Sequence, residues 1–180
     1  MVILSVLGLN SAVAAQIRCG EPYTLGSIAQ TAYAQLHRET TFAFGGTGYG
    51  GNISDGEKAI DVLMEDVAAP NALYELATTN AGVGGLYGLA GLRILNCDCL
   101  RDATDRFLKL PDQPEKKNVP FFGTIAAGDV MTLHGCVGSF EKRTAIVEQL
   151  EKGEFDSWFE FSKRLKKQRA EKAKTKKEKQ

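Results

Sequence analysis

The sequence contains few of the residues that most often bind metals or carry out catalysis. It has two histidines and one tryptophan in 180 residues. No apolar run approaches the roughly 20 residues that a helix needs to cross a membrane. A phosphate-binding loop of the Walker type ends in a lysine next to its last glycine, whereas Lys58 comes only after a helix-capping segment that follows Gly51. These shortages argue against a membrane-spanning protein and against a P-loop nucleotidase.

The charges of the chain are balanced in number but not in position. The sequence has 22 acidic and 22 basic residues, and ten of the basic ones lie with two glutamates in residues 163–180. This end is therefore close to +8 and the rest close to −8. We expect a solvated helix or a disordered tail that could contact an anionic surface. Its first cations, the candidate contacts, are Lys163, Arg164, Lys166, Lys167 and Arg169.

The first residues have the pattern of a secretory signal peptide. An apolar run from Val2 to Leu9 is followed by small residues, and a cleavage site after Ala14 or Ala15 fits this pattern. No Lys or Arg precedes the run, so the alternatives are a start farther upstream or a buried first strand or helix. We predict a signal peptide over residues 1–15 and a mature protein that is periplasmic or secreted.

Export would make disulfides the default state of the cysteines. The four cysteines are Cys19, Cys97, Cys99 and Cys136. Because Cys97 and Cys99 are separated by one residue, we expect them to face different partners, one bonding to Cys19 and the other to Cys136. The sequence does not choose between these pairings.

A metal site or a reactive cysteine is the rival interpretation of the same residues. Cys97, Cys99, His134 and Cys136 could bind zinc or a soft copper ion, although their spacing matches no common zinc pattern. A cysteine-dependent enzyme would use Cys136 with His134 or with His37, and no third group that would orient the histidine is evident. The sequence predicts no cofactor, and an enzyme is the less favoured interpretation.

Helical spacing of apolar residues dominates residues 16–162, which we predict to form a single, mainly α domain. It would be a compact array of antiparallel helices. Residues 121–137 favour extended structure instead and predict a short β-hairpin with a turn near Gly128 and Asp129. The predicted helices cover residues 23–39, 54–67, 70–77, 81–95, 100–108 and 139–153, with a last amphipathic segment at residues 155–165.

Two features define these helices more closely. Ser54 precedes Glu57 by three residues, which is the spacing of a capping box at a helix N-terminus. In residues 81–95, Gly84, Gly88 and Gly91 would form a smooth strip that lets another helix approach closely. The glycine content also leaves a strand as the alternative for that segment.

A glycine-rich stretch at residues 45–51 is the candidate functional loop, with Gly46, Gly48, Tyr49 and Gly51 as its candidate residues. Its G-x-G-x-x-G spacing occurs in dinucleotide-binding proteins, where it follows a strand and opens a strand–helix–strand unit. The segments after this loop are predicted to be helical, so we favour a loop that crosses close to the body. Free N–H groups beside a helix N-terminus would still attract anions.

Several short motifs resemble uncharacterised exported bacterial proteins that have a HEAT-like helical body. They are GGTGYGG followed by SDGEKA, then ALYELA, GLYGLAGLRIL and HGCVGSF. The resemblance covers roughly Tyr23 to Phe155. It implies a glycine turn that leads into a capped helix, a compact helical array, and a cysteine near the C-terminal part of the body. No catalytic residue is implied.

Three classes of function follow, and no specific activity can be assigned. We favour an exported helical protein with a structural or macromolecule-binding role, because stacked helices leave broad surfaces free. The first alternative is a cysteine-dependent enzyme or metal-binding protein centred on Cys136 and His134. The second is nonspecific binding of an anionic surface or of nucleic acid through the basic tail. Since no large apolar or aromatic residue follows Leu165, such binding should weaken steeply with salt.

Overall fold

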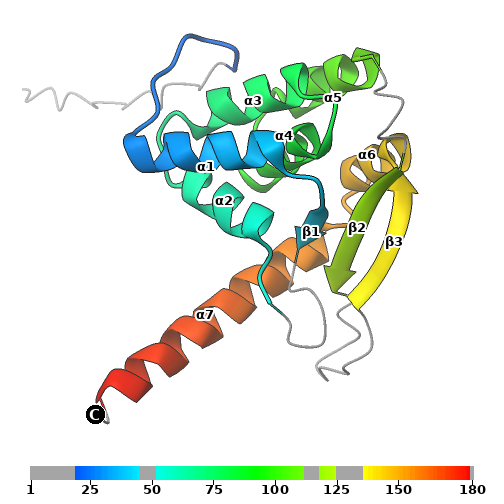
Figure 1. The fold of residues 1–180 in the computed structure, drawn as a ribbon. Coiled ribbons are helices and arrows are strands. Elements are labelled where there is room, and N and C mark those ends of the chain that lie inside the picture. Colours follow the sequence, from blue (N-terminus) through cyan, green and yellow to red (C-terminus); the bar gives the residue numbers. More distant parts are fainter. Residues whose placement is uncertain (1–18, 45–51, 112–117, 125–135, 179–180) are drawn as a thin grey trace, which may run out of the picture.

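The computed structural model describes residues 19–44, 52–111, 118–124 and 136–178. This part of the chain is mainly α, as the sequence predicts (Figure 1). Its elements in chain order are α1 (Ser27–Arg38), β1 (Phe42–Phe44), α2 (Asp55–Met64), α3 (Ala69–Thr79), α4 (Val83–Ile94), α5 (Leu100–Lys109), β2 (Asn118–Thr124), β3 (Cys136–Lys142), α6 (Arg143–Glu151) and α7 (Asp156–Glu178).

Helix α4 lies at the centre of the core. Every residue from Val83 to Leu92 is buried, because neighbouring helices surround α4 on all sides. The predicted glycine strip is what permits this packing. A Cβ atom at Gly88 would lie 2.7 Å from both Ala77 N and Leu73 O of α3, so the two backbones are in direct contact. The helical interpretation of residues 81–95 is therefore correct.

The short strand β1 is held to the core by Tyr87 of α4. The N–H of Ala43 donates to the Tyr87 hydroxyl (3.0 Å), which in turn donates to the Ala43 carbonyl (3.1 Å). Burial raises the pKa of Tyr87 far above its usual value, so the phenol stays protonated. Gly56 of α2 lies against the same ring, where a Cβ atom would be 2.5 Å from the hydroxyl oxygen. One buried phenol thus positions both β1 and the start of α2.

The three strands form one small sheet in the order β1–β2–β3. β1 pairs in parallel with β2, with Phe42 opposite Phe121, and β2 pairs antiparallel with β3, with Thr124 opposite Cys136. The antiparallel pair agrees with the predicted hairpin, and its strands extend beyond residues 121–137 at both outer ends. The predicted turn at Gly128 and Asp129 lies outside the described residues.

Some details of the predicted helices are wrong. The helical spacing of apolar residues in segments 23–39 and 54–67 predicts Ile28 and Val67 on buried faces, but 74% of Ile28 and 91% of Val67 is exposed. Val67 lies beyond the end of α2 and is outside the helical register. The helix expected from residue 139 starts only at Arg143, because Ser139–Lys142 belong to β3. Gly153 does follow the end of α6 with a φ of 75°, as expected for a C-terminal cap.

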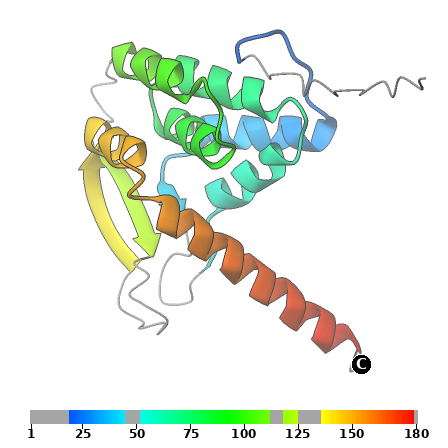
Figure 2. The ribbon, with the colours of Figure 1, turned by 180° about the vertical axis from the view of Figure 1, so that it is seen from behind.

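Helix α7 leaves the body and projects away from it, as Figures 1 and 2 show from opposite sides. Phe155, just before α7, and Phe159 in its first turn pack on the core and are 2% and 6% exposed. Arg93 of α4 fixes the start of α7 with two hydrogen bonds to Asp156 (3.1 and 2.7 Å). For residues 163–178, helix is the correct one of the two predicted alternatives. Among the described residues, no helix has the length and apolar content needed to cross a membrane.

Candidate functional site: a cationic helix and its acidic anchor

The candidate site begins at the first turn of α2, where Ser54 caps the helix. The Ser54 hydroxyl accepts a hydrogen bond from the N–H of Glu57 (3.0 Å), which is half of the predicted capping box. The same hydroxyl lies 3.1 Å from the carbonyl of Ala43 and donates to it. The cap therefore joins the N-terminus of α2 to β1 and fixes the position of Glu57.

Glu57 is completely buried, at 0% exposure, although it carries a carboxylate. Its Oε1 accepts a hydrogen bond from the hydroxyl of Ser162 on α7, which is 2% exposed. Lys166, one turn farther along α7, lies 3.1 Å from the same oxygen. A buried carboxylate is costly unless it is paired and hydrogen-bonded. Ser162 and Lys166 of α7 are two partners of this kind, so Glu57 acts as the acidic anchor of that helix.

Lys166 also contacts the next acidic residue of α2, with its Nζ 2.5 Å from Asp61 Oδ2. Asn52, Ile53, Lys58, Asp61 and Lys166 line a cavity of about 330 Å³ beside this contact. The cavity contains one carboxylate and two ammonium groups, and Lys58 and Lys166 each form an ion pair with an aspartate. Lys166 is predicted from its position in the basic tail to be a tail contact, but in the structure it holds α7 on α2.

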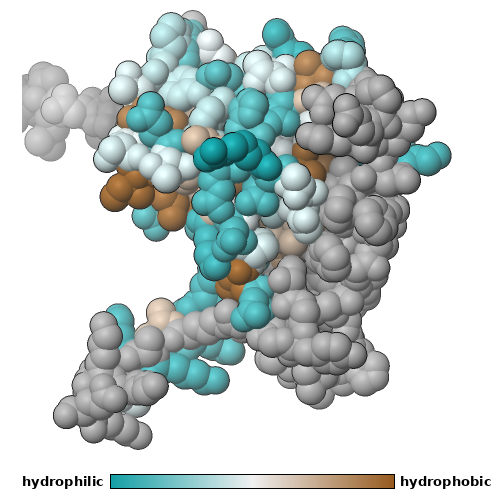
Figure 3. Space-filling view, viewed as in Figure 1, coloured by the Kyte–Doolittle hydropathy of each residue, from teal (hydrophilic) through white to brown (hydrophobic). Residues whose placement is uncertain are grey.

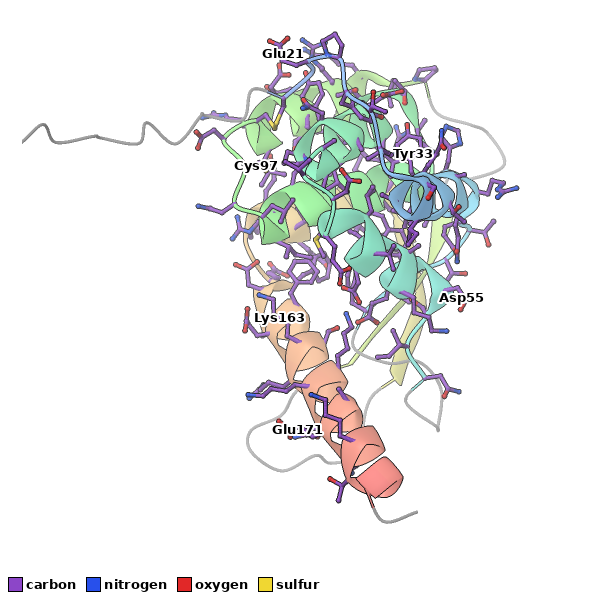
Figure 4. The ribbon with its side chains drawn as sticks, turned by 90° about the vertical axis from the view of Figure 1, so that its left-hand side faces the viewer. Glu21, Tyr33, Asp55, Cys97, Lys163 and Glu171 are labelled. Carbon is purple, nitrogen blue, oxygen red and sulfur yellow. A yellow bond between two sulfur atoms is a disulfide. The ribbon has the colours of Figure 1, made fainter. Side chains whose placement is uncertain are left out.

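On both sides of this anchor, described cations of α7 face solvent. Lys163, Arg164, Lys167, Lys172 and Lys174 are all exposed. Figure 4 shows Lys163 where α7 leaves the body and Glu171 farther along the projecting part. In the space-filling view of Figure 3, a wide notch lies between the coloured part of α7 and the helices above it. The side chain of Arg169, another predicted contact, is not among those described.

The only partner of Lys163 among the described ion pairs is Glu160 on the same helix, at 2.9 Å. Both side chains are exposed, and an i,i+3 pair of this kind contributes little to stability. The charge of Lys163 is therefore accessible to a binding partner. The projecting half of α7 is a folded helix with exposed positive charges. It extends from a body whose net charge is negative.

The glycine loop cannot be placed beside this helix, because Gly46, Gly48, Tyr49 and Gly51 lie outside the described residues. The segments on either side of it are described. β1 ends at Phe44 before the loop, and Asn52 and Ile53 after it line the cavity at Lys166. The predicted capped helix after the loop is therefore correct, and a short strand precedes the loop.

A disulfide joins Cys19 to Cys99, with 6.1 Å between the two Cα atoms. It attaches the segment before α1 to the start of α5, across a sequence separation of 80 residues. One of the two predicted disulfides is thus confirmed, and Cys99 is the partner of Cys19.

The second predicted disulfide is wrong, because Cys97 has a free, half-buried thiol. Burial, together with the charge of Asp98, raises the pKa of this thiol, which makes it a poor nucleophile at neutral pH. Cys136 belongs to β3, but its side chain is not described, and His134 lies outside the described residues. Within the described part of the chain, no three His, Cys, Asp or Glu side chains are grouped to hold a metal ion.

Sequence reasoning found the cations of α7 but missed Glu57 as their anchor. The spacing from Ser54 predicts a role for Glu57 in capping, and nothing in that pattern indicates burial. A signal existed in the helical spacing of Ser162 and Lys166, which puts a hydroxyl and an ammonium group on one face of α7. Recognising the contact requires the position of α7 relative to α2, and this depends on the whole core.

Comparisons with protein-family models, with curated proteins and with solved structures find no match to this chain.

Proposed function

We propose that this chain is an exported helical protein that binds a macromolecule carrying repeated negative charges, and that α7 is its binding element. The observation that carries this proposal is the course of α7, which is anchored at Lys166 and projects from the body with exposed cations on both sides of that residue. A preformed helix loses little conformational entropy when it binds. It also keeps its charges in a fixed spacing.

Export is supported by the Cys19–Cys99 disulfide, because disulfides persist in oxidising compartments. In the bacterial envelope, phosphate groups on polymers and on lipid headgroups are the chemistry that a row of lysines and arginines would contact. The exposed residues of the outer part of α7 are polar or small. Binding would therefore be electrostatic, without insertion of side chains into a bilayer.

The test compares the full chain with two triple variants that have the same net charge. One is Lys167→Glu, Lys172→Glu and Lys174→Glu on α7. The control is Arg101→Glu, Lys109→Glu and Lys152→Glu, which are exposed positions on the body. Binding is measured to long-chain polyphosphate and to phosphatidylglycerol vesicles over a series of salt concentrations.

We expect the wild-type chain and the body control to bind, with an affinity that falls steeply with salt. Each lost phosphate contact should reduce the slope of log K against log salt by about 0.7 to 0.9, so the α7 variant should lose about two units. Binding to only one probe would identify polymer or lipid as the source of the phosphates. Equal loss in both triple variants would overturn the proposal, because net charge and not α7 would then be responsible.

Export is tested separately by the intact mass of protein purified from its native host without reductant. Loss of the first 14 or 15 residues would support export, and a full-length chain with four free thiols would contradict it. This result does not depend on α7, so the two parts of the proposal can fail independently.

A further inference from the structure

A second surface feature, remote from α7, lies where the segment after Cys19 crosses α1 and α3. Residues 20–25, Gln30, Tyr33 and Glu75 line a cleft of about 600 Å³ there. Figure 4 shows this segment running from Glu21 to the start of α1, on which Tyr33 lies. None of these lining residues is basic, whereas Glu21 and Glu75 contribute two carboxylates.

The wall formed by residues 20–25 is held in place at both ends and in its middle. The Cys19–Cys99 disulfide fixes one end, and the N–H of Gly26 donates to Asp66 Oδ2 (3.0 Å) at the other. Between them, the N–H of Glu21 donates to Asn71 Oδ1 (3.2 Å). The cleft is therefore a built feature of the fold, and a ligand would not have to order it.

Glu75 is an exposed residue in the lining of the cleft. Its Oε2 accepts a hydrogen bond from the hydroxyl of Tyr23 (2.6 Å), and Tyr33 interacts with both groups. Burial, followed by the contact with Glu75, raises the pKa of both phenols, so they remain protonated donors beside the carboxylate. Among the ion pairs of the described residues, none involves Glu75. Within the described part of the chain, the carboxylate therefore has two neutral hydrogen-bond donors and no ion-pair partner.

We propose that this cleft binds an alkylammonium group, with Glu75 as its counter-ion and the rings of Tyr23 and Tyr33 as its aromatic walls. A carboxylate supplies a charge-assisted hydrogen bond to an ammonium group, and aromatic faces attract the same cation through their quadrupoles. An anionic ligand would be repelled by the two carboxylates, Glu21 and Glu75. The ammonium group belongs either to a lysine side chain of a partner protein or to a free polyamine.

The experiment titrates the full, oxidised chain with three probes at constant ionic strength, using calorimetry or NMR shifts. The probes are tri-lysine amide, its fully acetylated form and spermidine. The acetylated peptide has nearly the same shape without the charge. We expect the first probe or the third to bind and the acetylated peptide to bind at least about tenfold more weakly. Preference for tri-lysine indicates a protein partner, and preference for spermidine indicates a free polyamine.

Glu75→Gln keeps an acceptor for Tyr23 but removes the charge, and it should weaken binding about tenfold. The matched control is Glu65→Gln, which removes the same charge at an exposed position of the body. Gln30→Lys places a cation at the exposed rim of the cleft and should block binding without removing any contact of the wall.

Two patterns of binding would overturn the proposal. One is equal binding of the charged and acetylated peptides, which would indicate a site for neutral ligands such as sugars. The other is binding that Glu65→Gln weakens as much as Glu75→Gln, since net charge alone would then explain it. Binding to none of the three probes also rejects the proposal.

Discussion

Lys166 of α7 lies 3.1 Å from Oε1 of Glu57, a carboxylate in the first turn of α2 that is fully buried. The ion pair joins two helices that are far apart in the sequence. The contact also lies close to the point at which α7 leaves the body. Exposed cations lie on both sides of Lys166. Stability and the proposed binding function are therefore connected at this contact.

Removal of Lys166 should weaken the attachment of α7. Lys166→Ala removes the ammonium group that pairs with the buried Glu57 carboxylate. We expect the free energy of unfolding to fall by about 1 to 3 kcal/mol. Lys163→Ala, which breaks only the exposed pair with Glu160, should change it by less than about 0.5 kcal/mol. Urea unfolding of both variants measures the difference.

Hydrogen exchange gives a second measurement of the same contact. Amides in the first turn of α2 and around Ser162 should exchange faster in Lys166→Ala than in Lys163→Ala. Similar unfolding energies and similar exchange in the two variants would show that the anchor contributes nothing.

The Cys19–Cys99 disulfide should be a major source of stability. It closes a separation of 80 residues, and a loop of that length corresponds to about 2 to 4.5 kcal/mol in the chain-entropy model. The double variant Cys19→Ser, Cys99→Ser should lose that amount, and its denaturant midpoint should no longer respond to reductant. Cys97→Ser is the control: it removes a free thiol, and its midpoint should still fall on reduction. A midpoint of the wild-type protein that is insensitive to reductant would contradict the prediction.

Local patterns in the sequence correctly predict the structural features that depend on residues close together in the chain. Ser54 caps α2 because its hydroxyl reaches the N–H of Glu57, and this spacing can be read directly. The spacing of Gly84, Gly88 and Gly91 likewise predicts a close approach to neighbouring segments, and the packing of α4 depends on this approach. Capping and glycine spacing encode local or pairwise constraints, so sequence reasoning predicted them correctly.

The features that depend on the assembled fold could not be predicted in this way. Ile28 has the spacing of a core residue but is 74% exposed, because the buried face of α1 is narrower and uses Ala29, Ala32 and Leu36. The choice of Cys99 over Cys97 as the partner of Cys19 requires the position of the α4–α5 turn. The cleft at Glu75 was missed for the same reason, since Tyr23, Tyr33 and Glu75 come from three separate segments.

Gly88 should tolerate no side chain. A Cβ atom there would lie 2.7 Å from backbone atoms of α3, which cannot move away as a flexible side chain could. We expect Gly88→Ala to destabilise the protein by about 1 to 3 kcal/mol through overpacking, despite the better helix propensity of alanine. At Gly26, the nearest atom to a new Cβ is Asp66 Oδ2 at 3.3 Å. Gly26→Ala should therefore cost less, and equal thermal shifts in the two variants would contradict close packing of α3 and α4.

Asp66 should make stability depend on pH in the acid range. Its carboxylate accepts hydrogen bonds from the N–H groups of Ala68 (2.8 Å) and Gly26 (3.0 Å), and these bonds lower its pKa below the ordinary value of 3.8. Since the folded pKa is below the unfolded one, the contribution is fully present above about pH 4 and is lost as pH falls through the folded pKa.

Asp66→Asn removes the ionisable group from the turn between α2 and α3. We expect the variant to be less stable than the wild-type protein at pH 7 and to lose less stability between pH 5 and pH 2, because one proton-linked step is absent. Urea midpoints across this range measure both effects, and Asp105→Asn serves as a control with the same change of charge at an exposed position. If Asp66→Asn and the wild-type protein lost stability in parallel as the pH fell, the two backbone hydrogen bonds would not favour the ionised carboxylate. The turn would then hold the segment before α1 through its geometry alone, and the wall of the cleft at Glu75 would be insensitive to acid.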